Sequence, residues 1–159
     1  MGSLSKIDLA YIAGFLDGDG SLMLQIKKRK DSKLKRRFMT TICFYQDTRH
    51  EKSLYWIRGI LNIGYISRRN DGMTELRING YKQVRDILKR LMPFVKFKKV
   101  QTLSLYKAAK LLSETSLKKL NKKQLILLVG FILKIQNENY TTKRKKTKEE
   151  LFQVLDITP

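Results

Sequence analysis

The segment that most constrains this chain spans residues 11–20, where an apolar helical stretch runs directly into two aspartates: YIAGFLDGDG. Ala10, Gly14 and Gly18 recur every fourth residue, so they share one helix face on which a second backbone can approach closely. We expect Asp19 just past the end of this helix, beside main-chain carbonyls without helical partners. Because the helix dipole disfavours a carboxylate there, the arrangement points to a bound hard cation. The alternative is a buried amphipathic helix with a glycine cap and a solvated Asp-Gly turn.

Composition narrows the classes of partner. The chain has 159 residues, with 34 lysines and arginines against 14 aspartates and glutamates, a net charge of +20. A single domain of this size can bury its own core, and so large a charge indicates a polyanionic partner, either nucleic acid or an anionic membrane surface. No run of 18 apolar residues is present, and the N-terminal residues lack a secretory signal. Cys43 and His50 are the only cysteine and histidine, which excludes an intrachain disulfide, a cysteine-based zinc cluster and a histidine triad.

Hydrophobic periodicity predicts one mixed domain over residues 1–159. Alternation indicates a first strand over 23–31, a basic hairpin tip over 27–37, and a return strand that buries Phe38, Thr40, Ile42 and Phe44. A capping box at residues 48–51 opens a helix that ends near Gly64. A second hairpin is expected at 65–69 and 73–79, followed by helices at 81–92, 101–113, 117–136 and 148–155. The chain thus predicts an α+β domain with a helical extension over about 115–159.

The string at residues 11–20 and the order of the elements after it resemble the LAGLIDADG homing endonucleases. The resemblance implies an αββαββα fold with a saddle-shaped antiparallel sheet and extra C-terminal helices. In this family, chains with one motif work as homodimers, and no second Asp-Gly-Asp-Gly motif occurs here. We therefore expect the motif helix, at about residues 8–18, to form the dimer interface through Ala10, Gly14 and Gly18.

The resemblance also implies an active site. Two copies of the helix would bring two Asp19 carboxylates together, and a divalent cation between them would offset their repulsion. Asp19 from each subunit, with help from the Gly18 carbonyl, fits Mg²⁺, and Mn²⁺ is a possible substitute. Gln46 corresponds to a residue that orders water near the metal, and Lys98 to one that steadies the scissile phosphate. A solvated loop glutamine and a solvated lysine are the alternatives.

Two other polar residues of this region have less defined roles. We interpret Asp17 as part of the local structure at the helix end rather than as a metal ligand. The resemblance implies an arginine at position 50, where this chain has His50, and a neutral histidine would supply a hydrogen bond without a permanent charge. A helix-surface histidine is the simpler interpretation.

A basic sheet face is the expected DNA-reading surface. A β-ribbon fits the major groove, where arginine reads guanine and glutamine reads adenine. The first strand spans about 30 Å, or about nine base pairs, so a homodimer would read a pseudo-palindrome of roughly twenty. The alternative is a basic surface that binds phosphates without reading bases. The residues expected on the exposed face are Gln25, Lys27, Arg29, Arg37, Thr41, Ser67, Arg69, Glu75 and Arg77.

Two finer expectations concern this surface. Glu75 is expected to pair with a nearby basic residue rather than to take part in catalysis. The basic tract over 143–146, with Arg144, Lys145 and Lys146, would clamp phosphates outside the groove, although a disordered basic tail has the same pattern.

The predicted function is therefore a homodimeric DNA endonuclease that cuts both strands of a long site with Mg²⁺. Its partners would be double-stranded DNA and a second copy of the chain, with no membrane and no small-molecule substrate. It would act inside the cell with its DNA target, in an organelle or a prokaryotic cytoplasm, and would not be secreted. The alternatives are a non-catalytic nucleic-acid-binding protein of the same fold, either an intron splicing cofactor or a transcription regulator, and a basic structural protein of a ribonucleoprotein.

Overall fold

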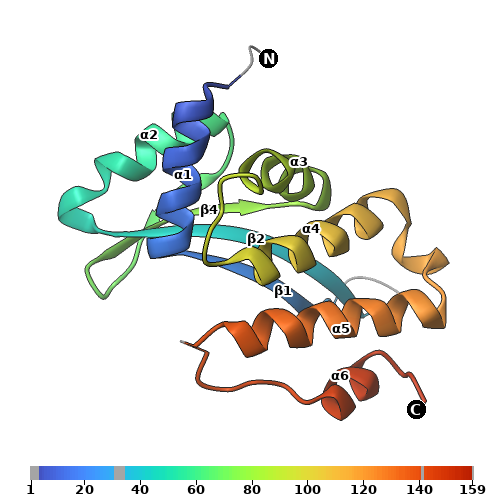
Figure 1. Ribbon diagram of the computed structural model, residues 1–159. Helices are drawn as coiled ribbons and strands as arrows, with labels where there is room; N and C mark the ends of the chain where they lie inside the picture. The colour runs from blue at the N-terminus through green and yellow to red at the C-terminus, as the bar shows by residue number, and fades with distance from the viewer. Residues whose placement is uncertain (1–3, 31–34, 141, 159) are drawn as a thin grey trace.

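The structure, a computed structural model, describes residues 4–30, 35–140 and 142–158. Helices cover one face of a four-stranded antiparallel sheet (Figure 1). In chain order the elements are α1 (Lys6–Asp19), β1 (Gly20–Lys28), β2 (Arg36–Asp47), the short 3-10 turn η1 (Thr48–His50), α2 (Lys52–Leu61), β3 (Tyr65–Arg68), β4 (Met73–Asn79), α3 (Tyr81–Leu91), α4 (Lys99–Glu114), a second 3-10 turn η2 (Leu117–Lys119), α5 (Lys122–Glu138) and α6 (Lys148–Val154). The predicted α+β fold, with the order αββαββα and further C-terminal helices, is confirmed.

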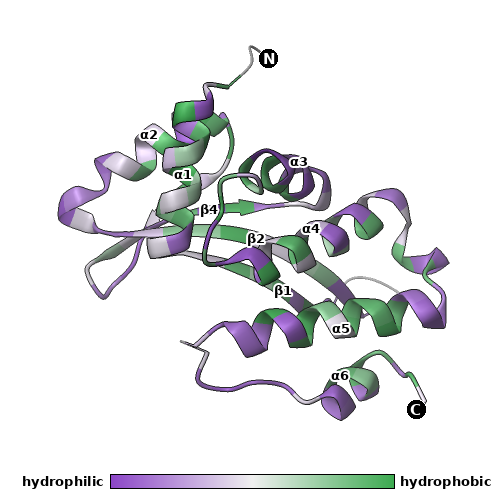
Figure 2. Ribbon diagram, viewed as in Figure 1, coloured by the Kyte–Doolittle hydropathy of each residue, from purple (hydrophilic) through white to green (hydrophobic). Residues whose placement is uncertain are grey.

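The sheet has the strand order β1-β2-β4-β3, so the two hairpins join in the middle through β2 and β4. Ile42 of β2 lies between Leu22 of β1 and Ile78 of β4. These three side chains are buried, and they point toward the helical layer, which is apolar on its inner side (Figure 2). Because side chains alternate along a strand, the intervening residues lie on the opposite face. That face is the one that α1 to α4 leave uncovered.

The C-terminal helices extend the same core. Helix α5 packs against β1, which is an edge strand, and α6 packs against α5 (Figure 1). Leu151 and Phe152 of α6, with Leu155 and Ile157 after it, are buried in the core cluster. The C-terminal extension is therefore a packed part of the domain.

The turn between α2 and β3 depends on its backbone. Asn62 ends α2 in the left-handed conformation, and Gly64 follows with a φ of 104°. A Cβ atom at Gly64 would meet Leu76 Cδ1 at 2.7 Å, so both the positive φ and the close approach favour glycine. This turn brings β3 directly from α2 onto the edge of β4.

Some predicted boundaries are wrong. The first strand begins at Gly20 rather than at residue 23, and its expected end at Asp31, like part of the hairpin tip, lies outside the described residues. The capping box at 48–51 does not form, because Asp47 caps the turn through the Arg49 amide and Glu51 bonds to Arg68 instead. The segment predicted as one helix over 117–136 divides into η2 and α5, whose own capping box is Asn121 with Gln124. Within the described residues, no helix is long and apolar enough to cross a membrane.

Candidate active site and nucleic-acid interface

The two aspartates at the end of α1 lie in different surroundings. The Asp17 carboxylate accepts three main-chain hydrogen bonds, from Lys96 at 2.7 Å, Phe97 at 3.2 Å and Lys98 at 2.9 Å. These amides precede α4, where a helix N-terminus favours a negative group. Asp17 thus ties the end of α1 to the start of α4, which agrees with its interpretation as local structure.

The Lys98 side chain also connects the start of α4 to the end of α1. Its Nζ donates to the carbonyl of Leu16 at 2.9 Å and to that of Asp17 at 2.7 Å. A cation at a helix C-terminus interacts favourably with the dipole and with carbonyls that lack helical partners. Burial lowers the pKa of the Lys98 ammonium, and the carboxylates of Asp17 and Asp19 act in the opposite direction. Lys98 is therefore a partly buried cation beside Asp19, rather than a solvated surface lysine.

Asp19 is the last residue of α1, not the first residue beyond it as expected. Its side chain is exposed, and its carboxylate makes no hydrogen bond or ion pair within residues 4–30, 35–140 and 142–158. It lines an open cleft of about 820 Å³ together with Gly18, Lys98, Arg69 and Tyr140. The described residues contain no group of three or more acidic, histidine or cysteine side chains that could hold a metal ion. One chain thus offers a free carboxylate and a neighbouring ammonium at an open cleft.

Gln46 lies inside β2 rather than after it, and on the face that the helices cover. Its Oε1 accepts a hydrogen bond from the Asp47 amide at 2.9 Å, and it is not among the residues that line the cleft. His50 is exposed at the end of η1. Its neighbour Arg49 pairs with Asp47 at 2.8 Å. Within one chain, the fold therefore does not place Gln46 or His50 beside Asp19.

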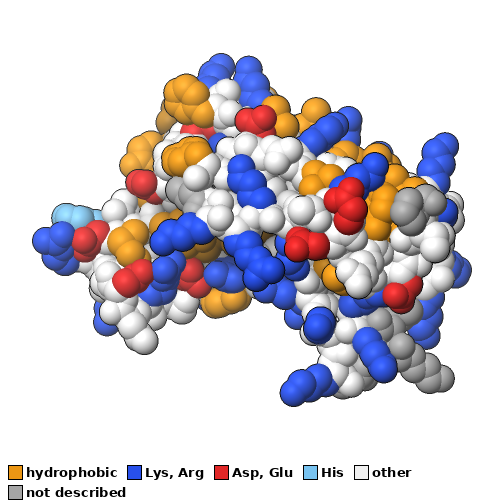
Figure 3. Space-filling model, turned by 90° about the horizontal axis from the view of Figure 1, so that it is seen from below, with side chains coloured by type: hydrophobic (Ala, Val, Ile, Leu, Met, Phe, Trp, Pro, Cys, Tyr) orange, Lys and Arg blue, Asp and Glu red, His pale blue; other side chains and the backbone are white. Residues whose placement is uncertain are grey.

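The uncovered face of the sheet carries most of the residues predicted to read DNA, and lysine and arginine side chains gather over it (Figure 3). Lys27 of β1 and Arg37 of β2 are exposed and lie opposite one another, next to Gln25. Arg29 and Arg69 are exposed in the turns beyond β1 and β3. The expectation that Thr41 is exposed is wrong: it is fully buried and donates to Asn79 Oδ1 at 2.7 Å. Thr41 is buried because its strand, β2, is central in the sheet, between β1 and β4.

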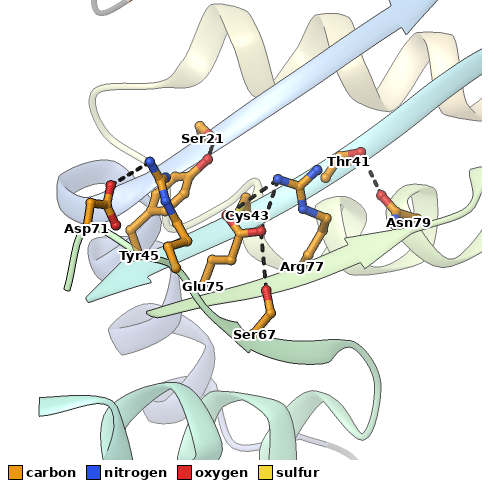
Figure 4. Close-up of polar contacts among 10 residues, drawn as sticks. Ser21, Thr41, Cys43, Tyr45, Ser67, Asp71, Glu75, Arg77 and Asn79 are labelled. Atoms are coloured by element: carbon orange, nitrogen blue, oxygen red, sulfur yellow. Dashed lines mark hydrogen bonds and ion pairs between the residues drawn. The ribbon is translucent and has the colours of Figure 1, made fainter. Parts of the chain in front are cut away.

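The middle of this face holds a network of polar side chains (Figure 4). Glu75 forms an ion pair with Arg77 at 3.2 Å, as the predicted pairing with a basic residue requires. Arg69 pairs with Asp71 at 2.7 Å, and the hydroxyls of Ser21 and Tyr45 bond at 3.1 Å. Sequence reasoning did not single out Asp71, Asn79 or Tyr45 with Ser21 as partners. Alternation along each strand could have placed these residues on this face. Which of them form pairs depends on the strand register, which the sequence alone does not reveal.

The basic tract at 143–146 is held in place rather than trailing from the domain. The Gln136 side chain of α5 bonds twice to the main chain of Lys146, with Nε2 donating to its carbonyl and Oε1 accepting from its amide, both at 3.2 Å. Arg144 and Lys146 line a groove of about 230 Å³ beside β1 that Gln25 and Lys27 also line. The structure thus places part of the predicted phosphate clamp next to the predicted reading strand.

The small-residue face of α1 is uncovered. Ala10, Gly14 and Gly18 are exposed, and a Cβ atom on either glycine would have no described atom within 4 Å. Ile7 and Tyr11, on the same side of the helix, are 81% and 60% exposed. The Tyr11 ring also packs edge-on against Trp56 of α2, with ring centroids 5.3 Å apart. The apolar surface around the motif therefore continues from α1 onto α2.

The relatives of this chain are endonucleases. The chain is 33% identical over 96 residues to the DNA endonuclease I-CvuI of Chlorella vulgaris, which covers 60% of each protein. It is 28% identical over 152 residues to the DNA endonuclease I-CreI of Chlamydomonas reinhardtii, which covers 96% of this chain and 91% of the relative.

Solved structures and the family model agree with these relatives. I-CvuI bound to its own DNA target in the presence of calcium superposes with a TM-score of 0.78 at 26% identity, over 97% of this chain and 98% of that one. The archaeal intron-encoded homing endonuclease I-Vdi141I, complexed with DNA, has the same fold, with a TM-score of 0.79 at 21% identity over 94% and 95% of the two chains. The model of the LAGLIDADG endonuclease family matches residues 12–110, which include all but the first residue of the motif, both hairpins and the junction at Lys98. The chain therefore belongs to the LAGLIDADG endonuclease family.

Proposed function

We propose that this protein is a site-specific homing endonuclease that acts as a homodimer and hydrolyses both strands of a long, pseudo-palindromic DNA site with a divalent metal ion. The observation that carries the proposal is the exposed Asp19 carboxylate, which lies beside Lys98 at the end of an uncovered small-residue helix face. Family membership supports it, and so does the similarity to the DNA endonucleases I-CvuI and I-CreI. The protein would act wherever its DNA target lies, in an organelle or a prokaryotic cytoplasm.

Dimerisation would complete the active site. Packing two α1 helices along Ala10, Gly14 and Gly18 buries a face that one chain leaves open, and Tyr11 would extend that contact. It would also place two Asp19 carboxylates near each other at the carbonyl ends of the two helices. Two such charges about 4 Å apart repel by roughly 4 kcal/mol at an effective dielectric constant of 20. The repulsion explains why a cation belongs at this seam.

The donor set at this position suits a hard cation. Asp19, with the Gly18 carbonyl, would hold Mg²⁺, which needs few protein ligands and keeps several waters, and Mn²⁺ would also be accepted. When bound, the metal supplies an activated water and stabilises the attacking and leaving oxygens of phosphodiester hydrolysis. Lys98, already oriented by two carbonyls, would place a positive charge beside a scissile phosphate.

DNA would lie along the uncovered sheet face. The nine residues of β1 span about 30 Å, close to nine base pairs, so two copies of the sheet would cover roughly twenty. Gln25 has the side chain that reads adenine, and Arg37 and Arg77 have the one that reads guanine. Lys27, Arg29, Ser67 and Arg69 flank them, and Arg144, Lys145 and Lys146 would hold phosphates at the edge of β1.

A plasmid-cleavage experiment tests the proposal. The protein is incubated with a plasmid that carries the DNA flanking its own gene, in Mg²⁺ and, in parallel, in EDTA. Double-strand cleavage at one site in Mg²⁺ alone is the expected result, and the Asp19→Asn protein should not cut. Tight binding to the plasmid with no cleavage under any metal would instead identify a non-catalytic nucleic-acid-binding protein of the same fold.

A further inference from the structure

One acidic side chain lies in the middle of the face that would contact DNA. Glu75 alternates with Arg77 on β4 and lies opposite Ser67 of β3 and Tyr45 of β2. Cys43 of β2 lies opposite Arg77 and contacts Glu75 diagonally (Figure 4). The Glu75 side chain is 12% exposed and that of Arg77 is 27% exposed. A carboxylate facing a polyanion is unfavourable unless another group compensates its charge. The position of Glu75 on this face therefore needs an explanation.

Both carboxylate oxygens of Glu75 face protein neighbours. Oε1 forms an ion pair with Arg77 Nη2 at 3.2 Å and accepts a hydrogen bond from Ser67 Oγ at 3.5 Å. Oε2 accepts from the same Nη2 at 3.4 Å and from Cys43 Sγ at 3.9 Å. The donors come from three residues around the carboxylate, and little of the Glu75 side chain is left exposed to an external ligand. Glu75 is thus directed toward its protein neighbours rather than toward DNA.

The same contacts fix the Arg77 guanidinium. Nη2 is held by Glu75, and Nε is buried without a partner among the described residues. Nη1 and the second hydrogen of Nη2 therefore remain for an external ligand. Two parallel N–H donors at that end match the O6 and N7 acceptors of guanine. The pair of Arg69 with Asp71 differs, because its side chains are 46% and 50% exposed and solvent competes with the contact.

We propose that Glu75 is a positioning residue that sets DNA specificity by holding Arg77 against one guanine in each half-site, without touching the base itself. This inference rests on the proposed DNA-reading role of the sheet. It predicts that the two residues act as one unit. Losing Glu75 would leave the arginine charge in place but would release the side chain into several orientations.

A double-mutant cycle measured by binding to a library of sites tests this unit. Glu75→Gln keeps the shape of the side chain and should reduce discrimination at one base pair per half-site about tenfold, and Arg77→Gln should abolish it at the same base pair. The double variant should match Arg77→Gln alone. Glu149→Gln is the matched control, because it removes one negative charge from an exposed position on α6 and should change affinity for all sequences alike.

Two results would overturn the proposal. If Glu75→Gln keeps its full effect in the Arg77→Gln background, then Glu75 contacts the base directly. If Glu75→Gln and Glu149→Gln give the same sequence-independent change, then only net charge matters. Ser67→Ala removes a single contact to the carboxylate and should give a smaller loss at the same base pair, which keeps the test valid if Glu75→Gln folds poorly.

A thiol measurement tests the protein side of the unit without DNA. Burial raises the pKa of Cys43 to about 11, and the Glu75 charge adds to that increase. Glu75→Gln should therefore lower the titration midpoint of Cys43, followed in the folded protein by its ¹³Cβ chemical shift, and an unchanged midpoint would contradict the contact. If the wild-type chain binds no DNA, the proposed function fails, but the Cys43 titration still reports on the contact between Glu75 and Cys43.

Discussion

Asp17 and Asp19 are separated by one glycine, yet the fold gives them opposite surroundings. Asp17 accepts three main-chain hydrogen bonds from residues 96–98, whereas the Asp19 carboxylate faces an open cleft. A carboxylate that accepts hydrogen bonds stabilises the folded protein. A carboxylate without partners at a helix C-terminus destabilises it, because the helix dipole is negative at that end. Substituting each by asparagine should therefore separate a structural role from a catalytic one.

We expect Asp19→Asn to lose cleavage entirely, to keep DNA binding, and to melt in EDTA at least as high as the wild type, because the change removes a like-charge pair from the dimer. Asp17→Asn is the matched variant and should be less stable by about 1–3 kcal/mol, since the amide offers one acceptor oxygen where the carboxylate offers two. Thermal melts in EDTA and cleavage time courses in Mg²⁺ measure both. A large loss of stability in Asp19→Asn would make Asp19 the structural acceptor.

At the residue scale, the sequence predicted the roles of side chains whose surroundings depend on nearby residues of the chain. The motif identified Asp19, and its helix-end geometry indicated the structural role of Asp17. The burial of Thr41 and the placement of Gln46 could not be predicted, because both depend on which strand lies opposite. A shift of one residue in register moves a side chain to the other face of the sheet.

At the scale of elements, α1 has an apolar and small-residue face that no other element covers. If two copies pack there, Gly14→Leu should force the helices apart and give monomers. Gly130→Leu on α5 is the control, because a side chain at that glycine would also meet open space but away from α1. Sedimentation velocity at micromolar concentration without DNA measures both, and a monomeric wild type would rule out the homodimer.

The basic segment between α5 and α6 illustrates a second limit of sequence at this scale. Its composition alone fits a clamp or a disordered tail equally well, because the Gln136 contacts with Lys146 span ten residues and have no sequence signature. Gln136→Met keeps the side-chain length but removes both hydrogen bonds. Limited trypsin digestion should then cut at 143–146 several times faster, whereas Gln153→Met, at an exposed position on α6, should digest like the wild type. Equal rates in all three proteins would show that Gln136 does not hold the segment.

At the scale of the whole molecule, charge and base reading are carried by different regions. The net charge of +20 is spread over the chain, and lysine and arginine gather on the uncovered face (Figure 3). On the same face, in contrast, Arg77 of β4 pairs with Glu75, and Arg69 in the turn between β3 and β4 pairs with Asp71. Exposed lysines bound to phosphates release counterions and should set the dependence of affinity on salt, whereas the paired arginines should set sequence preference.

This division predicts different results for Lys145→Ala and Arg77→Ala. Lys145→Ala should weaken binding to all sequences alike, and because a dimer loses two phosphate contacts, the slope of log K against log salt should become shallower by about 1.8. Arg77→Ala should cost about 1–3 kcal/mol at one base pair per half-site and leave the slope nearly unchanged. Binding to a library of sites at several salt concentrations measures both effects. If the two variants change slope and preference in the same way, the sheet is an unspecific basic surface and base reading resides elsewhere in the molecule.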